Sequence, residues 1–258
     1  MSWSASQYVR FEDQRTRPVR DLLAAVAPRP VRHATDLGCG PGNSTEVLLQ
    51  RCPDSQVIAL DSDQDMLGQA RQRPRLNVPR VRFEQADIAQ WSAAQPQDLI
   101  LANASLQWVP AHETLYPHLV AQLSEGGSLA VQTPDNLDEP AHRRLREVAG
   151  SGEWAATFAD FSLPPRHAAP FYFELLAPLC ERVDVWRTTY HHPLAGGVDA
   201  VVEWFKGSAL RPYLARLDPA GQTAFLAQYR EALRADYPGA DDAQVLLAFP
   251  RLFVVATR

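Results

Sequence analysis

The stretch Asp36-Leu37-Gly38-Cys39-Gly40-Pro41-Gly42-Asn43 (DLGCGPGN) follows a short β-type run, Arg32 to Leu37, and precedes a segment with helical spacing. Its alternate glycines let the backbone turn sharply and let a ligand approach the main chain closely. Asp61 ends a second strand-like run farther along the chain. A carboxylate at that position can accept both hydroxyls of a ribose. The stretch therefore predicts a strand–turn–helix unit that binds a ribose-bearing cofactor.

The chain on either side of this turn alternates β-type runs with segments of helical spacing. This alternation is typical of a parallel sheet covered by helices. The predicted strands are Arg32–Leu37, Gln56–Asp61, Val81–Gln85, Asp98–Asn103 and Ser128–Thr133. The helices predicted between them are Ser44–Arg51, Gln64–Arg73 and Glu113–Leu123.

The pattern changes after about Thr133, where prolines cluster and helical segments such as Val198–Phe205 and Pro219–Arg234 appear. Two further strand-like runs remain. We therefore predict one domain over residues 1–258, in which residues from about 30 to 135 form the cofactor-binding core. A helical cap insertion is expected at about 140–245, interrupted by a strand at 183–190, and a final strand at 251–257.

Composition excludes several classes of protein. With 46% hydrophobic and 21% charged residues, the chain is neither disordered nor fibrous. A net charge of -5 argues against a nucleic-acid partner, because such proteins need a basic face. No apolar run approaches the roughly 18 to 20 residues of a membrane span, and the N-terminus lacks the apolar core of a signal peptide. The three cysteines have no metal-site spacing, so we expect reduced thiols, no metal and a cytoplasmic location.

Charge at the glycine turn discriminates between cofactors. A nicotinamide dinucleotide presents a pyrophosphate, which prefers free N–H groups and no nearby carboxylate. Pro41 removes one N–H donor and Asp36 adds a negative charge. S-adenosylmethionine instead presents an ammonium and a sulfonium, which suit an acidic turn. Methyl transfer is the leading interpretation, while a nicotinamide-dependent oxidoreductase and a non-catalytic cofactor-binding regulator remain alternatives.

Several motifs carry a family resemblance. DLGCGPGN, ALDS (59–62), QADI (85–88) and DLILANASLQW (98–108) together resemble the class I S-adenosylmethionine-dependent methyltransferases. The segments that resemble the trans-aconitate 2-methyltransferase family, across almost the whole chain, are NASLQWVP (103–110), HLV (118–120), WRTTY (186–190), LRPYL (210–214) and LLAFPRLFVVA (246–256).

This resemblance implies a Rossmann-like α/β fold with a seven-stranded, mostly parallel sheet and helices on both faces. It also implies monomethyl esterification of a small tricarboxylate, trans-aconitate, by S-adenosylmethionine, with S-adenosylhomocysteine as the other product. Another small acid remains an alternative substrate.

The resemblance also implies cofactor-binding residues. Asp36 and Gly38, with Gly40 in the same turn, would contact the methionine end, and Asp61 the ribose. The adenine would lie against Asp87 and Ile88, and Asn103 would lie near the transferring methyl group.

A tricarboxylate needs matching cationic groups, because an unmatched buried carboxylate is costly. The planar guanidinium of arginine suits a carboxylate. Candidates in the second half of the chain are Arg166-His167, Arg187 with Tyr190, His191-His192, Arg211 with Tyr213, and Arg251. We expect Arg187, Tyr190, Arg211 and Tyr213 to bind substrate, since they fall in the resembling segments.

No general base is expected, because a carboxylate is already ionised at pH 7. The segment Tyr8 to Phe11 is expected either to cover the cofactor or to pack as a helix on the sheet. The sequence does not predict an oligomeric state.

Overall fold

The computed structural model describes residues 12–162, 166–237 and 244–258; the segment Tyr8 to Phe11 lies outside these ranges. Its seven strands form one sheet in the order β3-β2-β1-β4-β5-β7-β6. The strands are β1 (His33–Leu37), β2 (Gln56–Asp61), β3 (Val81–Gln85), β4 (Gln97–Asn103), β5 (Leu123–Pro134), β6 (Arg182–Ala195) and β7 (Gln244–Thr257). Strands β1 to β5 pair in parallel, and β7 is antiparallel to β5. The predicted fold class, a seven-stranded and mostly parallel sheet with helices, is confirmed.

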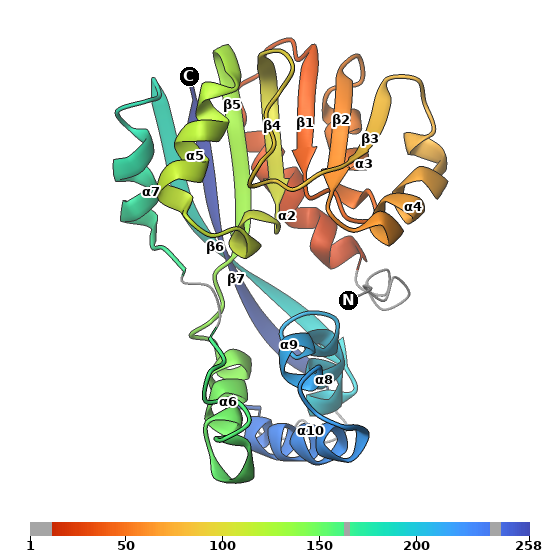
Figure 1. The fold of residues 1–258 in the computed structure, drawn as a ribbon, viewed down its shortest axis with the longest axis vertical. Helices are drawn as coiled ribbons and strands as arrows, with labels where there is room; N and C mark the ends of the chain where they lie inside the picture. Colours follow the sequence, from red (N-terminus) through yellow and green to blue (C-terminus); the bar gives the residue numbers. More distant parts are fainter. Residues whose placement is uncertain (1–11, 163–165, 238–243) are drawn as a thin grey trace. The chain divides into compact units, whose positions relative to one another are not determined.

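Helices cover both faces of the parallel part of the sheet (Figure 1). α5 (His112–Ala121) and α7 (Ala169–Leu176) lie on one face, and α2 (Glu12–Ala25) and α3 (Asn43–Arg51) on the other. α4 (Gln64–Gln72) packs beside β2 and β3. The core under α5 and α7 is built from alternate strand residues, among them Ile100, Leu129 and Leu252. Because strand side chains alternate between faces, the residues between these belong to the other face.

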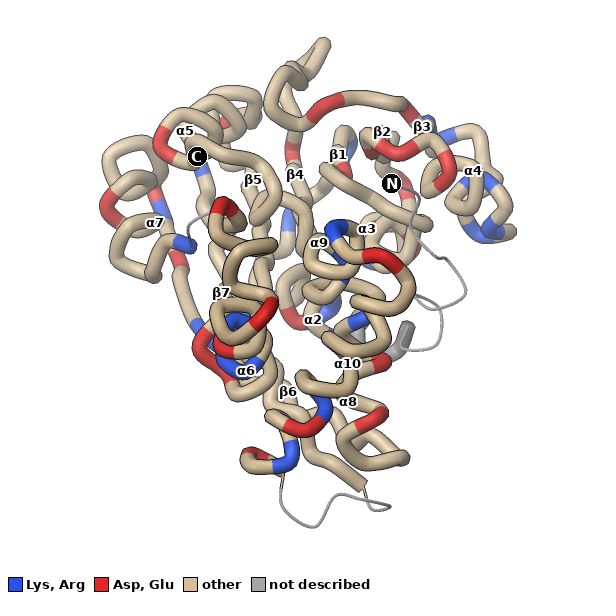
Figure 2. Tube along the Cα trace, turned by 60° about the horizontal axis from the view of Figure 1, so that its bottom comes forward, with Lys and Arg blue, Asp and Glu red and all other residues tan. Residues whose placement is uncertain are grey.

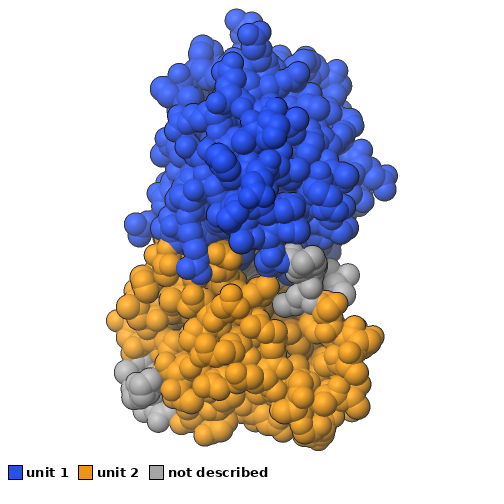
Figure 3. Space-filling view, turned by 90° about the vertical axis from the view of Figure 1, so that its left-hand side faces the viewer, with its two compact units in different colours: residues 1–134, 164–188, 251–258 blue, residues 135–163, 189–250 orange. Residues whose placement is uncertain are grey.

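Two compact units divide the chain (Figure 3). Unit 1 consists of Met1–Pro134, Pro164–Thr188 and Arg251–Arg258, and unit 2 of Asp135–Leu163 and Thr189–Pro250. Strands β6 and β7 each contribute residues to both units. Unit 1 contains the parallel strands, so the glycine turn and the predicted cofactor residues all lie in it.

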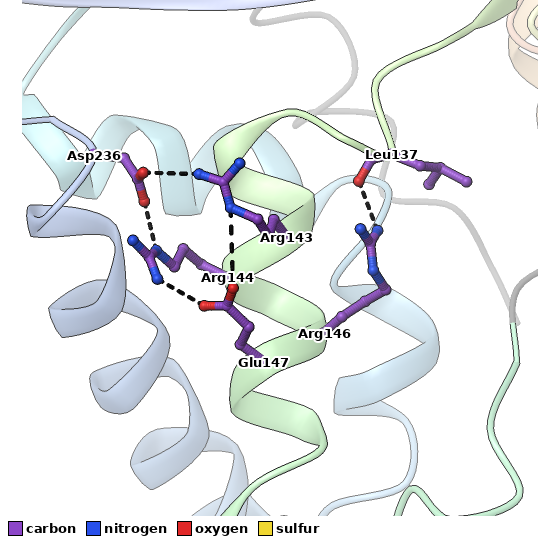
Figure 4. A network of polar contacts seen from close by, with 6 residues as sticks. All are labelled: Leu137, Arg143, Arg144, Arg146, Glu147 and Asp236. Atoms are coloured by element: carbon purple, nitrogen blue, oxygen red, sulfur yellow. Dashed lines mark hydrogen bonds and ion pairs between the residues drawn. The ribbon is translucent and has the colours of Figure 1, made fainter.

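Unit 2 is mainly helical. Its helices are α6 (Pro140–Ala149), α8 (Gly197–Lys206), α9 (Arg211–Leu214) and α10 (Pro219–Arg234). Trp154, Phe158, Tyr213 and Phe225 form an aromatic core. α6 carries both basic and acidic residues (Figure 2), and its Arg143 and Arg144 both reach Asp236 just after α10 (Figure 4). The division into a cofactor-binding core and a helical cap stays a prediction.

The later strands are longer than their sequence patterns indicated. β7 begins at Gln244 rather than at residue 251, and β5 begins at Leu123 rather than at Ser128. Pro250 lies inside β7, where it supplies a carbonyl that accepts the amide hydrogen of Asp135 at 2.9 Å. A proline cannot donate to a neighbouring strand, which is why the sequence pattern ended there.

Among the described helices, none has the length and apolar character needed to cross a membrane. Within the same ranges, no cluster of three or more His, Cys, Asp or Glu side chains is arranged to hold a metal ion.

Candidate functional site

The glycine turn between β1 and α3 is held to the next strand by its own amides. Those of Gly38 and Cys39 both donate to the carbonyl of Leu60, at 2.8 and 2.9 Å. The amide of Gly40 donates to Oδ2 of Asp61 at 2.9 Å, and that of Gly42 to the carbonyl of Cys39 at 3.0 Å. Pro41 has no amide hydrogen. Every backbone N–H group from Gly38 to Gly42 therefore already donates a hydrogen bond to another atom of the chain.

Steric surroundings separate the roles of two glycines. Gly38 has φ of +74°, and a Cβ there would lie 2.4 Å from Cβ of Ser105. Gly40 has φ of +54°, but a Cβ there would meet no described atom within 4 Å. Packing thus requires glycine at position 38, whereas Gly40 faces open space where a ligand can approach the main chain.

Asp36 is a buried carboxylate at the end of β1. Its Oδ2 accepts hydrogen bonds from Oγ of Ser44 at 2.8 Å and Oγ1 of Thr45 at 2.7 Å. Its Oδ1 is buried and has no hydrogen-bond partner in the described part of the chain. Desolvation raises the pKa of Asp36 to about 6, against the lowering effect of the two hydroxyls. Such a carboxylate is stabilised by a cation placed beside Oδ1.

Asp61 connects the turn to the end of β2. In addition to the Gly40 amide on Oδ2, its Oδ1 accepts the amide hydrogen of Asp63 at 2.9 Å. Partial burial raises the pKa of Asp61 above its ordinary value. Each carboxylate oxygen accepts more than one hydrogen bond, so capacity remains for the hydroxyls of a ligand.

Asn103 ends β4, the strand next to β1, at the point where the strand order reverses direction. Its Oδ1 is a second buried acceptor without a partner among the described residues. The register pairs Asp36 with Leu101, so Asp36 and Asn103 lie on the same sheet face, at the carboxyl ends of adjacent strands. In open α/β sheets, ligands bind at this switch point.

Two of the predicted cofactor residues, Asp87 and Ile88, follow β3. Ile88 lies near the glycine turn, and Asp87 hydrogen-bonds within its own loop. Cδ1 of Ile88 lies 3.4 Å from the position that a Cβ of Gly38 would take. Asp87 is exposed, and its Oδ1 accepts the amide hydrogen of Ala89 at 2.9 Å. Ile88 therefore lies against the glycine turn, while Asp87 stabilises the loop that carries it.

The four predicted substrate residues lie in different units. Arg187 belongs to unit 1 and is exposed on β6, where its neighbour Trp186 stacks on Phe253 at 4.8 Å. The others belong to unit 2: Tyr190, Arg211 and Tyr213. The ring of Tyr213 packs 4.4 Å from that of Phe161. Burial raises the pKa of Tyr213, so its hydroxyl stays protonated at neutral pH. Substrate binding by these four residues stays a prediction.

Two polar residues near the site, Ser105 and Gln132, were not identified as candidates from the sequence. Ser105 donates from Oγ to the carbonyl of Leu37 at 2.6 Å and so fixes the loop after β4 against β1. Gln132 is fully buried in β5, in register with Asn103. Its Oε1 accepts a hydrogen bond from Nη1 of Arg251. A glutamine directly after the apolar residues Leu129 to Val131 of this strand was the available signal.

Comparisons with known proteins agree with this geometry. Residues 34–127 match the family described as a methyltransferase domain. The trans-aconitate 2-methyltransferase of Sinorhizobium fredii is 50% identical over 260 residues, covering 100% of this chain and 99% of that protein. The enzyme of the same name from Yersinia pseudotuberculosis is 49% identical over 256 residues, covering 98% and 97%.

Solved structures share the fold at low sequence identity. The YcgJ protein of Bacillus subtilis superposes with a TM-score of 0.61 at 11% identity, over 94% of this chain and 98% of that one. The Haemonchus contortus phosphoethanolamine N-methyltransferase 2, solved with S-adenosyl-L-methionine, gives 0.55 at 13% identity, over 93% and 52%. The full-length relatives confirm the family that the sequence motifs indicated: the chain belongs to the trans-aconitate 2-methyltransferase family.

Proposed function

We propose that this chain methylates a carboxylate of trans-aconitate, with S-adenosylmethionine as methyl donor, and releases the monomethyl ester and S-adenosylhomocysteine. The cofactor is that of the class I methyltransferase family, as the sequence predicted. The observation that carries the proposal is the pair of buried acceptor oxygens, Oδ1 of Asp36 and Oδ1 of Asn103, left without partners in the described residues on one sheet face. Buried acceptors attract a cation and repel a phosphate.

The residues present fit S-adenosylmethionine. Asp36 offers an oxygen to its ammonium group, and Asn103 offers one beside the sulfonium and its methyl group. Gly38 and Gly40 allow close approach, and Asp61 retains acceptor capacity for the ribose hydroxyls. Ile88, with Asp87 beside it, would border the adenine.

A nicotinamide-dependent oxidoreductase is disfavoured by the same turn. Pyrophosphate binding at a strand–helix turn relies on free backbone N–H groups. The amides from Gly38 to Gly42 already donate to Leu60, Asp61 and Cys39, and Pro41 has none. The turn therefore lacks the donors that a dinucleotide needs there.

The chemistry needs no proton transfer by the chain. When bound, S-adenosylmethionine supplies an electrophilic methyl group; a carboxylate oxygen of the substrate bonds to it as the carbon–sulfur bond breaks and the sulfur keeps the electron pair. A carboxylate is already ionised at pH 7, so no general base is required. The protein's contribution is alignment, which can lower a barrier by about 7 to 11 kcal/mol.

Arg187, Tyr190, Arg211 and Tyr213 are retained as proposed substrate residues, because they fall in the family-resembling segments. Cytoplasmic location and the absence of nucleic-acid and membrane partners are likewise retained from composition as proposals.

The test is incubation of the purified chain with methyl-labelled S-adenosylmethionine and a panel of di- and tricarboxylates. We expect labelled, base-labile ester from trans-aconitate at a higher kcat/KM than from any other acid in the panel. Transfer to none of the acids, with S-adenosylhomocysteine bound, would favour a non-catalytic cofactor-binding protein. Binding of NADH in its place would favour an oxidoreductase.

A further inference from the structure

An arginine of unit 1 is buried beside the site. Arg251 in β7 has 4% of its surface exposed, and Gln132, to which its Nη1 donates, has 0%. β5 and β7 pair in a register that places Arg251 opposite Pro134, two residues beyond Gln132. Since residues i and i+2 of a strand share a face, Gln132 and Arg251 lie on the same sheet face.

That face is the one that carries the cofactor residues. Gln132 is the register partner of Asn103, so Asn103, Gln132 and Arg251 lie in a row across β4, β5 and β7. The row is at the carboxyl ends of the parallel strands, where ligands of such sheets bind. Asp36 on β1 pairs with Leu101 on β4, two residues before Asn103 on the same face, so the row continues the proposed cofactor site.

The chemistry of the row fits a carboxylate. Nε2 of Gln132 is a buried donor with no hydrogen-bond partner in the ranges that the structure describes. Oε1 of the same amide accepts from Nη1 of Arg251 and so orients the guanidinium group. A guanidinium held in one orientation beside a spare N–H presents donors to an anion.

Electrostatic repulsion at this edge of the sheet accounts for an arginine in this position. An anionic substrate at this edge meets the carboxylates of Asp36 and Asp61 on the same face, which repel it. A cationic group on the adjacent strands offsets that repulsion. Burial of a polar pair in a core is costly, so a site that keeps one is a candidate for function.

We propose that Arg251, oriented by Gln132, binds a non-reacting carboxylate of the substrate beside the methyl-transfer position at Asn103. This inference rests on the proposed function and deepens it by assigning a substrate-binding residue within unit 1. The reacting carboxylate stays free of this arginine, because a guanidinium held tightly on it would weaken it as a nucleophile.

The test combines enzyme variants with trimmed substrates. Glutaconate, mesaconate and itaconate each correspond to trans-aconitate without one of its three carboxylates. The variants are Arg251→Met, Gln132→Glu and the control Arg82→Gln, whose side chain on β3 is 76% exposed. Gln132→Glu keeps the arginine and places a carboxylate of the chain itself against it, so it tests the assignment even if Arg251→Met fails to fold. Kinetics are measured for each acid, and calorimetry measures S-adenosylhomocysteine affinity.

We expect Arg251→Met and Gln132→Glu to raise the KM for trans-aconitate by tenfold or more, with S-adenosylhomocysteine affinity within twofold of the parent and the control unchanged. For one trimmed acid, the one without the carboxylate that Arg251 holds, Arg251→Met should lose little further kcat/KM.

An unchanged KM in both variants, with an active parent enzyme, would overturn the assignment and leave the proposed function standing. Equal losses of substrate and cofactor affinity would also overturn it, since Arg251 would then support the fold. A parent that methylates none of the acids would overturn both.

Discussion

Among the carboxylates of the candidate site, Asp36 has the pKa that lies furthest from its ordinary value. Its pKa is raised from 3.8 to about 6 by burial, so the folded chain binds this proton more tightly than the unfolded chain does. The Asp36 contribution to the free energy of unfolding therefore falls as pH rises from about 4 to 6 and stays low above that. At neutral pH the buried charge costs on the order of 2–3 kcal/mol. A residue that destabilises the cofactor-free protein is typical of a binding site.

The corresponding variant is Asp36→Asn, which keeps an acceptor oxygen for Ser44 and Thr45 and removes the charge. We expect a more stable cofactor-free protein at pH 7.5, a flatter dependence of stability on pH between 4 and 6, and at least tenfold weaker S-adenosylhomocysteine binding. In the parent, affinity should fall as pH drops below about 6, because a bound cation favours ionised Asp36. Chemical denaturation and calorimetry across pH 5–8 measure both. Equal affinity and equal pH dependence in the two proteins would remove Asp36 from the site.

Two glycines of the turn allow the stability of the fold and the affinity for the cofactor to be tested separately. Gly38→Ala meets Cβ of Ser105 at 2.4 Å and needs φ of +74°, so it should cost about 3 kcal/mol or more of stability. Gly40→Ala carries only the backbone strain, about 1 kcal/mol, because its methyl group points into open space. That space is where we place the cofactor. Gly40→Ala should therefore lose S-adenosylhomocysteine affinity while melting close to the parent, and tight binding by this variant would contradict the placement.

The contact between α6 and the end of α10 is an element-scale feature of unit 2. Asp236 accepts from Nη2 of Arg143 at 3.0 Å and from Nε of Arg144 at 2.6 Å, with its side chain only 13% exposed (Figure 4). Asp236→Asn should lower Tm by about 2–4 °C, since both guanidinium groups lose their more buried anionic partner and keep only the half-exposed Glu147. The control is Glu231→Gln on α10, whose side chain is 79% exposed and pairs with Arg234. Equal melting of both variants and the parent would show that the network adds no stability.

Elements with local signals were predicted well from the sequence. β2 and β3 have the predicted bounds, and the β1 turn with its glycines was indicated by spacing alone, because a strand, a turn and a helix cap depend on neighbouring residues. The start of β7 at Gln244 was not predicted, because its pairing is decided by residues far along the chain and Pro250 interrupts the pattern.

At the scale of the whole molecule, the gathering of the proposed cofactor residues at one sheet edge was predictable from the sequence, and the contact between Gln132 and Arg251 was not. Asp36, Asp61 and Asn103 lie at the carboxyl ends of β1, β2 and β4, which are neighbours in the parallel sheet, so topology alone brings them to one edge. Gln132 and Arg251 are 119 residues apart and meet only through the antiparallel register of β5 and β7. Arg251 was one of several candidate arginines in the sequence, where Arg187 and Arg211 were preferred to it, and its burial singles it out.

Ligand binding should stabilise the molecule as a whole, because the site residues between 36 and 103 come together only on folding. A ligand of the native state at a hundred times its Kd adds about 2.7 kcal/mol to the free energy of unfolding. For a chain of 258 residues this corresponds to a rise in Tm of about 5–10 °C. We expect S-adenosylhomocysteine to produce this rise in differential scanning calorimetry. NADH at the same concentration should leave Tm unchanged, since the turn from Gly38 to Gly42 has no spare N–H group for its pyrophosphate. The reverse result would mean that the glycine turn holds a dinucleotide and that the electrostatic argument from Asp36 is wrong.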